Sequence, residues 1–319
     1  MEKIQALKEA ISTANKICVF TGAGISCPSG IPDFRSENGL YNEKGDYKYS
    51  PEEMISHTFF VNNTKLFYDF YKSKMIYEDA KPNKAHIYFA ELEKQYKRVS
   101  IVTQNIDSLH TMAGSTNVFE IHGSVKRNYC ICCREFYDEK YILNSAGVPR
   151  CKKCNGVIKP DVVLYEEGLN QDIVRGAIEA ISEAELLIII GTSLAVYPAA
   201  SFVSYFRGRK IALINKNKTD FDKKADIVIY DDIVNVIEKL EGWTQDVVFN
   251  FFFLKYNFAK FVVKWPKENG VICAYCIEKT ISCDFDLKKV DFNHNILWFF
   301  YWQHEIYLLL SYMLMKMKE

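Results

Sequence analysis

The sequence lacks three features that would point to a particular class of protein. It has no excess charge of either sign, because 40 Lys and Arg balance 40 Asp and Glu, so nothing global favours nucleic acid or an anionic membrane. Residues 1–16 are charged and amphipathic, without the apolar core of a signal peptide. No G-x-G-x-x-G follows the first apolar strand, since the next glycine after Gly24 is Gly30. We expect a cytoplasmic protein with no nucleic-acid partner.

Glycine and proline are also scarce after about residue 240, where two glycines and one proline remain while all four tryptophans lie there. We predict an appended, aromatic-rich extension, 241–319, of unknown role. Its apolar run 296–315 is long enough to span a membrane, but the polar residues 303–305 near its centre make a span costly, so membrane association is not favoured. The extension also holds three cysteines without a second matching pair, which we interpret as ordinary: Cys273, Cys276 and Cys283.

Before residue 240, short apolar runs alternate with helical patterns, and 49% hydrophobic residues suffice for a sizeable core. The predicted strands are Lys16–Thr21, Val99–Thr103, Leu186–Ile190, Lys210–Ile214 and Ile227–Tyr230. Two of the predicted helices are Asn83–Tyr96 and Asp172–Glu183. This alternation predicts an α/β fold with a mainly parallel, doubly wound sheet.

Glycine or polar residues follow the ends of several predicted strands. They occupy Gly22–Gly24, Gln104–Asp107, Gly191–Ser193 and Asn215. In open parallel sheets, ligands bind outside the carboxyl ends of the strands. The sequence therefore predicts a cofactor lying across this edge, although the glycines alone are weak support.

Two Cys-x-x-Cys pairs, 130/133 and 151/154, are separated by 17 residues. This spacing predicts one tetrahedral zinc site, and four thiolates leave no open position for water, so the zinc is expected to be structural. The predicted ligands are Cys130, Cys133, Cys151 and Cys154, with Cys132 as the spare cysteine. A zinc-ribbon module for nucleic acid is an alternative, but Lys152 and Lys153 are not accompanied by a stacked aromatic and basic face.

Several motifs, in order, resemble the sirtuins, and in particular those of bacterial type. The motifs are GAGISCPSGIPDFR at 22–35, TQNID at 103–107, IHG at 121–123, the four cysteines and GTS at 191–193. The resemblance covers roughly residues 1–240. It implies a large Rossmann-like part (about 1–40, 82–127 and 161–240) and a small inserted part, made of a helical insertion (about 41–81) and a zinc module (128–160). NAD and an acyl-lysine peptide would meet in the cleft between them.

The activity that the resemblance implies is NAD-dependent protein-lysine deacetylation. The acyl-lysine carbonyl attacks the NAD ribose, nicotinamide leaves, and the products are deacylated lysine and 2′-O-acetyl-ADP-ribose. A general base with a pKa near neutrality is needed, a role suited to histidine, and the resemblance assigns it to His122. Asn105 and Asp107 join it as catalytic residues, although such side chains also cap helices. NAD glycohydrolysis, ADP-ribosyl transfer and desuccinylation or demalonylation remain alternatives.

The same resemblance assigns binding residues. The cofactor residues are Gly22, Ala23, Gly24, Cys27, Asp33, Phe34, Arg35, Gln104, Asn105, Ile106, Asp107, His122, Gly191, Thr192, Ser193, Asn215 and Ile233. The substrate residues are Val163, Tyr165 and Val196. The stretch around Val163 and Tyr165 is expected to pair with the substrate backbone as an added strand.

Two positions depart from the family pattern. Tyr165-Glu166-Glu167 stands where sirtuins commonly have Phe-Gly-Glu, so the turn loses a glycine. Tyr71-x-x-Lys74 takes the place of the Tyr-x-x-Arg pair of sirtuins that prefer succinyl or malonyl groups. Lysine cannot form the bidentate fork of arginine, and we interpret Lys74 as a helix-surface residue.

Overall fold

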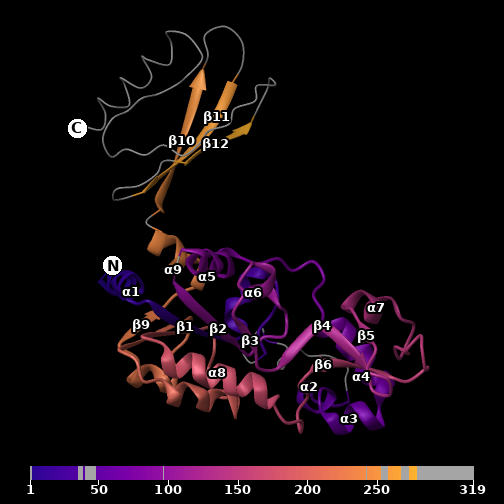
Figure 1. Ribbon diagram of the computed structural model, residues 1–319. Coiled ribbons are helices and arrows are strands. Elements are labelled where there is room, and N and C mark those ends of the chain that lie inside the picture. Colours follow the sequence, from indigo (N-terminus) through magenta and orange to yellow (C-terminus); the bar gives the residue numbers. More distant parts are fainter. Residues whose placement is uncertain are drawn as a thin grey trace. The chain divides into compact units, whose positions relative to one another are not determined.

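The computed structural model describes residues 2–34, 39, 48–95 and 97–241, and the backbone of three strands within 243–278. The chain divides into two compact units, Met1–Glu241 and Gly242–Glu319. Figure 1 labels the elements. Arg35, Cys283 and the apolar run 296–315 lie outside the described residues.

The first unit contains a six-stranded sheet whose neighbouring strands all pair in parallel, in the order β3-β2-β1-β7-β8-β9. The strands are β1 Lys16–Thr21, β2 Arg98–Thr103, β3 Val118–Glu120, β7 Leu186–Ile190, β8 Lys210–Asn215 and β9 Ile227–Tyr230. The predicted parallel sheet is confirmed. Only the short β3 was not anticipated.

Both faces of this sheet are buried, which explains why its strands are continuous apolar runs. Alternate side chains of β1 enter different cores: Ile17 and Val19 one, Cys18 and Phe20 the other. One core is completed by helices α1 Glu2–Thr13, α5 Lys84–Lys94 and α9 Ile233–Glu241. The opposite core is completed by α8 Gln171–Glu183 and the 3-10 helix η4 Ala199–Tyr205. Helices on both faces make the sheet doubly wound.

The two predicted helices begin at side-chain caps. The Asn83 side chain accepts from Ala85 N at the start of α5, and the Asn170 side chain accepts from Asp172 N and Ile173 N at the start of α8. Asn at this position satisfies amides that have no partner within the helix. Asn83 is therefore the cap of α5 rather than its first helical residue.

A smaller part of the same unit has its own core and an antiparallel sheet in the order β5-β4-β6. Its elements are α2 Pro51–Met54, α3 His57–Asn62, α4 Thr64–Lys74, β4 Gly123–Cys130, β5 Phe136–Tyr137, α7 Glu139–Asn144 and β6 Ile158–Val162. The remaining short helices are η1 Ala23–Ile25, η2 Cys27–Ser29, α6 Leu109–Met112 and η5 Asp220–Lys224. Two segments far apart in sequence thus share one core. We call this part of the protein the small module.

The second unit contains a three-stranded antiparallel sheet in the order β10-β11-β12. Its strands are β10 Trp243–Phe252, β11 Phe258–Pro266 and β12 Cys273–Glu278. Cys273 and Cys276 lie in the last of them. Within the described part of the chain, no helix combines the length and apolar character needed to cross a membrane.

Candidate active site

Two glycine-containing turns touch at the carboxyl ends of β1 and β7. Gly22 N donates to Ile190 O over 3.0 Å, and Gly24 N donates to Gly191 O over 2.9 Å. A Cβ added to Gly24 would stand 2.6 Å from Gly191 Cα, so no side chain fits between the two turns. Gly191 itself has φ +61°, a conformation that favours glycine. The sheet edge is therefore kept bare, as close approach of a phosphate-bearing ligand to backbone amides requires.

Side-chain amides hold the neighbouring turns together. Asn215 Oδ1 accepts from Thr192 N over 3.1 Å, and Asn215 Nδ2 donates to Thr192 O over 3.0 Å. Gln104 Nε2 donates to Thr192 Oγ1 over 3.0 Å. The polar ends of β2, β7 and β8 thus form one linked edge, as the strand positions predicted.

Asn105 and Asp107 meet at Ser26, a residue that was not assigned to the site from sequence. Asn105 Nδ2 donates to Ser26 Oγ over 3.0 Å and to Gly22 O over 3.2 Å, and Ser26 Oγ donates to Asp107 Oδ2 over 2.7 Å. Burial raises the pKa of Asp107 above its ordinary value. Asp107 Oδ1 also accepts from Leu109 N over 2.8 Å, so this side chain caps α6 as well. Ser26 lies within the first sirtuin motif, the one signal that could have identified it.

His122 is oriented by a backbone carbonyl. Its Nδ1 lies 2.9 Å from Gln104 O, and since a carbonyl only accepts, Nδ1 carries the proton and Nε2 keeps its lone pair. Burial lowers the pKa of His122 below its ordinary value, although the Gln104 hydrogen bond opposes this. The ring is therefore neutral at pH 7 and can accept a proton at Nε2.

The small module fixes the backbone on both sides of this histidine. Val163 N donates to His122 O over 2.9 Å, directly after β6. The next residue, Gly123, has φ +77°, and a Cβ there would stand 1.9 Å from Asp161 O. Only glycine allows β4 and β6 to approach this closely. The residue after His122 must therefore be glycine at this contact between β4 and β6, which we call the joint.

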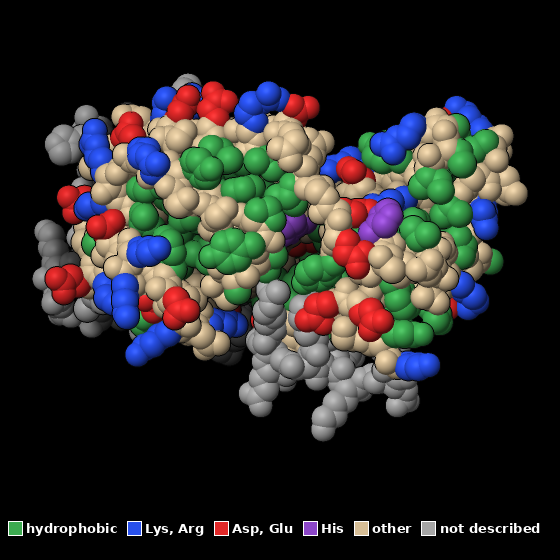
Figure 2. All heavy atoms as spheres, turned by 90° about the horizontal axis from the view of Figure 1, so that it is seen from below, with side chains coloured by type: hydrophobic (Ala, Val, Ile, Leu, Met, Phe, Trp, Pro, Cys, Tyr) green, Lys and Arg blue, Asp and Glu red, His purple; other side chains and the backbone are tan. Residues whose placement is uncertain are grey.

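These residues surround a cleft of about 860 Å³, which lies in the size range of small-molecule sites. Figure 2 shows a hollow between the larger and smaller parts, with hydrophobic side chains on both sides. Every predicted cofactor or substrate residue that the structure describes lines the cleft, except Asp107. Asp107 lines a smaller adjoining pocket, which shares Ala23, Phe34, Asn105 and Ile106 with the cleft.

On the substrate side, the backbone of Tyr165 is already paired within the protein. Tyr165 N donates to Ile55 O over 3.1 Å, and His57 N donates to Tyr165 O over 3.0 Å. A parallel bridge joins Tyr165 to Ser56. A substrate strand that pairs here must therefore use backbone groups other than those of Tyr165.

The Tyr71 and Lys74 pair is split between two cavities. Tyr71 is fully buried and lines the cleft, and its hydroxyl has no hydrogen-bond partner among the described residues. Lys74 is half-buried and lines the smaller pocket with Asn105 and Asp107. The structure places Lys74, the last residue of α4, beside that pocket, and its interpretation as a helix-surface residue stays a prediction. A lysine, moreover, cannot hold a carboxylate as a bidentate fork.

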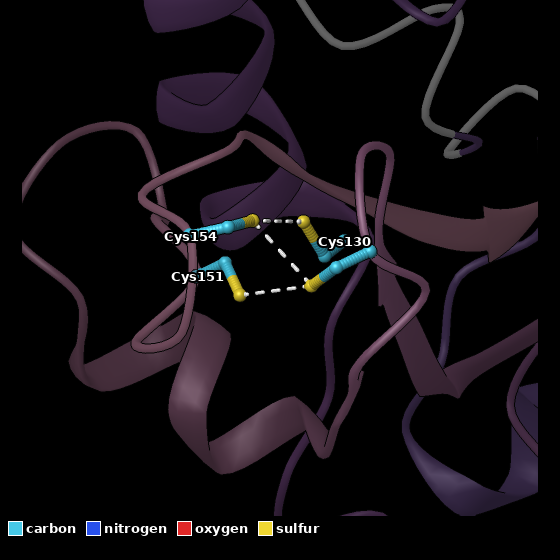
Figure 3. A group of neighbouring side chains, drawn as sticks. Cys130, Cys151 and Cys154 are labelled. Carbon is cyan, nitrogen blue, oxygen red and sulfur yellow. Dashed lines mark hydrogen bonds between the residues drawn. The ribbon is translucent and has the colours of Figure 1, made fainter.

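The four predicted cysteines converge in the small module, and Figure 3 labels three of them. Their Sγ atoms all lie within 4.8 Å of one another, and neighbouring pairs are 3.4 to 3.5 Å apart. Four sulfurs around a tetrahedral zinc would be about 3.8 Å apart. The amides of Cys132 and Lys153 donate to Cys130 Sγ and Cys151 Sγ. The cluster thus fits a structural zinc, and exposed Cys132 is not among the four.

The protein combines a doubly wound sheet, a four-cysteine module and a cleft between them, which is the architecture of Sir2 enzymes. Residues 22–198 match the sequence pattern of the Sir2 family. The chain is 58% identical to an NAD-dependent protein deacetylase of Clostridium perfringens over 240 residues, 75% of this chain and 98% of that protein. A second NAD-dependent protein deacetylase, from Clostridium acetobutylicum, is 54% identical over 239 residues, with the same coverage. The chain belongs to the Sir2 family.

Solved structures agree with this assignment. A Sir2 bound to acetylated peptide matches with a TM-score of 0.66 at 36% identity, covering 74% of this chain and 96% of that one. A Sir2 with a p53 peptide and NAD⁺ matches with a TM-score of 0.65 at 36% identity, with the same coverage. The predicted sirtuin fold is confirmed.

Proposed function

We propose that this chain is an NAD-dependent protein-lysine deacetylase that transfers the acetyl group of acetyl-lysine to ADP-ribose. The observation that carries the proposal is the position of His122: a neutral histidine, with Nδ1 engaged by Gln104 O, lines the same cleft as the glycine edge of the sheet. A base alone would suit many enzymes. This reaction needs a base close to both substrates. Here His122 lines the same cleft as the glycine turns that suit the phosphates of NAD and as the segment around Val163 and Tyr165 that suits a peptide.

NAD fits the residues present on the cofactor side. The cradle at Gly22, Gly24 and Gly191 leaves no room for a Cβ, while Thr192 and Asn215 offer polar atoms beside it. NAD supplies the ribose carbon that accepts the acyl oxygen, with nicotinamide as leaving group. The chain's own contribution is to position the two substrates and to shield the cleft from water.

Within the cleft, His122 Nε2 takes a proton from a ribose hydroxyl, because its other nitrogen is already protonated. Ser26 holds Asn105 and Asp107 in one orientation at the mouth of the smaller pocket. That pocket suits the carboxamide of nicotinamide, since it offers an amide and a carboxyl side chain at one end. Phe34, which lines both cavities, shields the reacting carbon from water.

The test is to incubate the full chain with NAD and acetylated peptide and to follow nicotinamide release. Release that depends on the peptide, with equal amounts of deacetylated peptide, supports the proposal. Release without peptide would instead make the chain an NAD glycohydrolase. His122→Ala should lower kcat by about 10²- to 10⁴-fold, the usual contribution of a general base, with zinc content unchanged.

The same assay with succinylated peptide tests the acyl preference. Because Lys74 cannot form the bidentate fork of arginine with a carboxylate, we expect acetyl-lysine to be preferred over succinyl-lysine. We also propose a cytoplasmic location, where NAD is present and the free thiols of a zinc site stay reduced.

A further inference from the structure

Glu166 occupies a turn position that normally belongs to glycine. Glu167 N donates to Leu164 O over 3.0 Å, which closes a four-residue turn, and Glu166, at the third position, has φ +76°. Type II turns need a positive φ there and therefore favour glycine. The turn keeps this geometry with a charged side chain instead.

A hydrogen bond from the helical insertion holds the Glu166 carboxylate in place. Glu166 Oε2 accepts from Thr58 N over 2.9 Å, across 108 positions of the sequence. Hydrogen bonds from Thr58 also hold the pKa of Glu166 below its ordinary value, so the group is ionised at neutral pH. Since Tyr165 is bridged to Ser56 on the same segment, both turn and carboxylate are anchored to one element.

Among the described residues, no lysine or arginine forms an ion pair with Glu166. In the described part of the chain, Glu166 and Glu167 are the only charged residues that line the substrate half of the cleft, from Val162 to Leu169 and around Val196. Lys159 Nζ compensates the Glu167 carboxylate at 2.9 Å, and His57 Nδ1 contacts the same carboxylate at 2.8 Å. Glu166 accepts from Thr58, a neutral residue, and is attracted by the same His57 ring that already contacts Glu167.

Two exposed tyrosine side chains line the same substrate half of the cleft. Tyr165 is 38% exposed and Tyr197 is 75% exposed, and both line the cleft. Tyrosine faces attract guanidinium and ammonium groups. Figure 2 shows acidic side chains beside the hollow on the side of the smaller part.

We propose that Glu166 determines specificity by selecting substrates that carry lysine or arginine next to the acetyl-lysine. The inference rests on the proposed deacetylation. Acetyl-lysine is itself neutral, so the charges that flank it dominate the electrostatic fit of the peptide. The two tyrosines provide faces on which the cationic side chain can lie.

The test compares two acetyl-lysine peptides of equal length, with arginine or glutamine on both sides of the acetyl-lysine. In the wild-type chain, kcat/KM for the arginine peptide should exceed that for the glutamine peptide by about two- to fivefold, the range of exposed charge pairs. This ratio should shrink at about 0.5 M salt, where such charges are screened. Glu166→Gln, which keeps an acceptor for Thr58 N and removes the charge, should bring the ratio to about one. Glu179→Gln, the same change on α8, is the matched control and should keep the wild-type ratio.

The outcomes separate the two proposals. Equal kcat/KM for both peptides in a turning-over wild-type enzyme overturns the role of Glu166 and leaves deacetylation intact. A preference for arginine that survives both Glu166→Gln and Glu166→Gly also overturns it. The glycine variant restores the residue that the turn favours, so it guards against a folding defect of the glutamine variant. If neither peptide stimulates nicotinamide release, the proposed function and this inference fall together.

Discussion

The unit Met1–Glu241 has two parts that are stabilised in different ways. The large part is the six-stranded sheet with its helices, and the other part is the small module. Every residue of β7 is buried, and the large sheet has apolar cores on both faces. The small module has short strands, one of which, β5, spans two residues, and its core includes Cys130 and Cys151 from the cysteine cluster. The large part thus buries apolar side chains on both faces of its sheet, whereas the core of the small module ends at the cysteine cluster that fits a zinc ion.

This contrast matters for activity because the site uses both parts. The sheet edge carries the residues proposed to bind NAD, whereas the backbone at His122 and Gly123 is held by the end of β6 in the small module. The cysteine cluster and the strands that hold His122 thus belong to the same small module, so loss of zinc should disturb the position of His122.

Removing the metal should give the largest effect. Cys151→Ser leaves three thiolates, and since structural zinc contributes roughly 10 kcal/mol or more, we expect loss of bound zinc and of measurable deacetylation. Amide hydrogen exchange should show increased exchange in β4 and β6 while β1 and β7 stay protected. Cys132→Ser is the control and should retain zinc and activity. Full zinc content in the Cys151→Ser protein would refute the assignment of the cluster.

Gly123→Ala tests the joint between the two parts. Its Cβ would overlap Asp161 O, which forces β4 away from β6 and shifts His122, so kcat should fall about 100-fold. Zinc content should not change. Gly147→Ala, also at positive φ (+62°) but with nothing within 4 Å of the new Cβ, isolates the backbone strain. Equal kcat values for the two variants would contradict the steric explanation.

Acid should weaken the large part through two buried histidines, His86 and His110. Burial lowers the pKa of His86 to about 4, and burial also holds that of His110 well below its ordinary value. Below about pH 6.5 the unfolded chain binds protons that the folded chain does not, so the free energy of unfolding falls by up to about 1.4 kcal/mol per pH unit per histidine. This loss continues to about pH 4 for His86. Urea unfolding at several pH values measures this loss, and His86→Gln should reduce the change in unfolding free energy per pH unit. If that change stays the same in the variant, His86 does not contribute to the acid sensitivity.

The smallest effect is expected at an ion-pair bridge between the two parts. Arg127 of β4 donates to Glu120 of β3 over 2.6 Å and to Asp161 of β6 over 2.8 Å. Because Arg127 is half exposed, Arg127→Ala should cost only about 1 kcal/mol in unfolding free energy after screening. A loss as large as that of Gly123→Ala would show that this bridge, rather than close backbone contact, sets the joint.

Much of the fold could be predicted because its signals are local. Five apolar runs predicted five strands, and two helical patterns predicted α5 and α8, whose starts the structure fixes through contacts of Asn83 and Asn170 within three residues. The cysteine spacing marked the metal site for the same reason, since each pair forms one knuckle. The site residues were found through motifs that lie at the ends of strands.

What the sequence determined by itself was therefore five of the six strands of the parallel sheet, which four cysteines cluster and which polar turns meet at one edge of that sheet. Only the tertiary structure decided that Ser26 joins Asn105 to Asp107, that Lys74 faces a pocket, and that Glu166 keeps a glycine conformation with its carboxylate on Thr58 N. These contacts join positions far apart in the chain, and their geometry depends on how whole elements pack. Local sequence patterns do not specify that packing, because a short segment has the same conformational propensities whichever element packs against it.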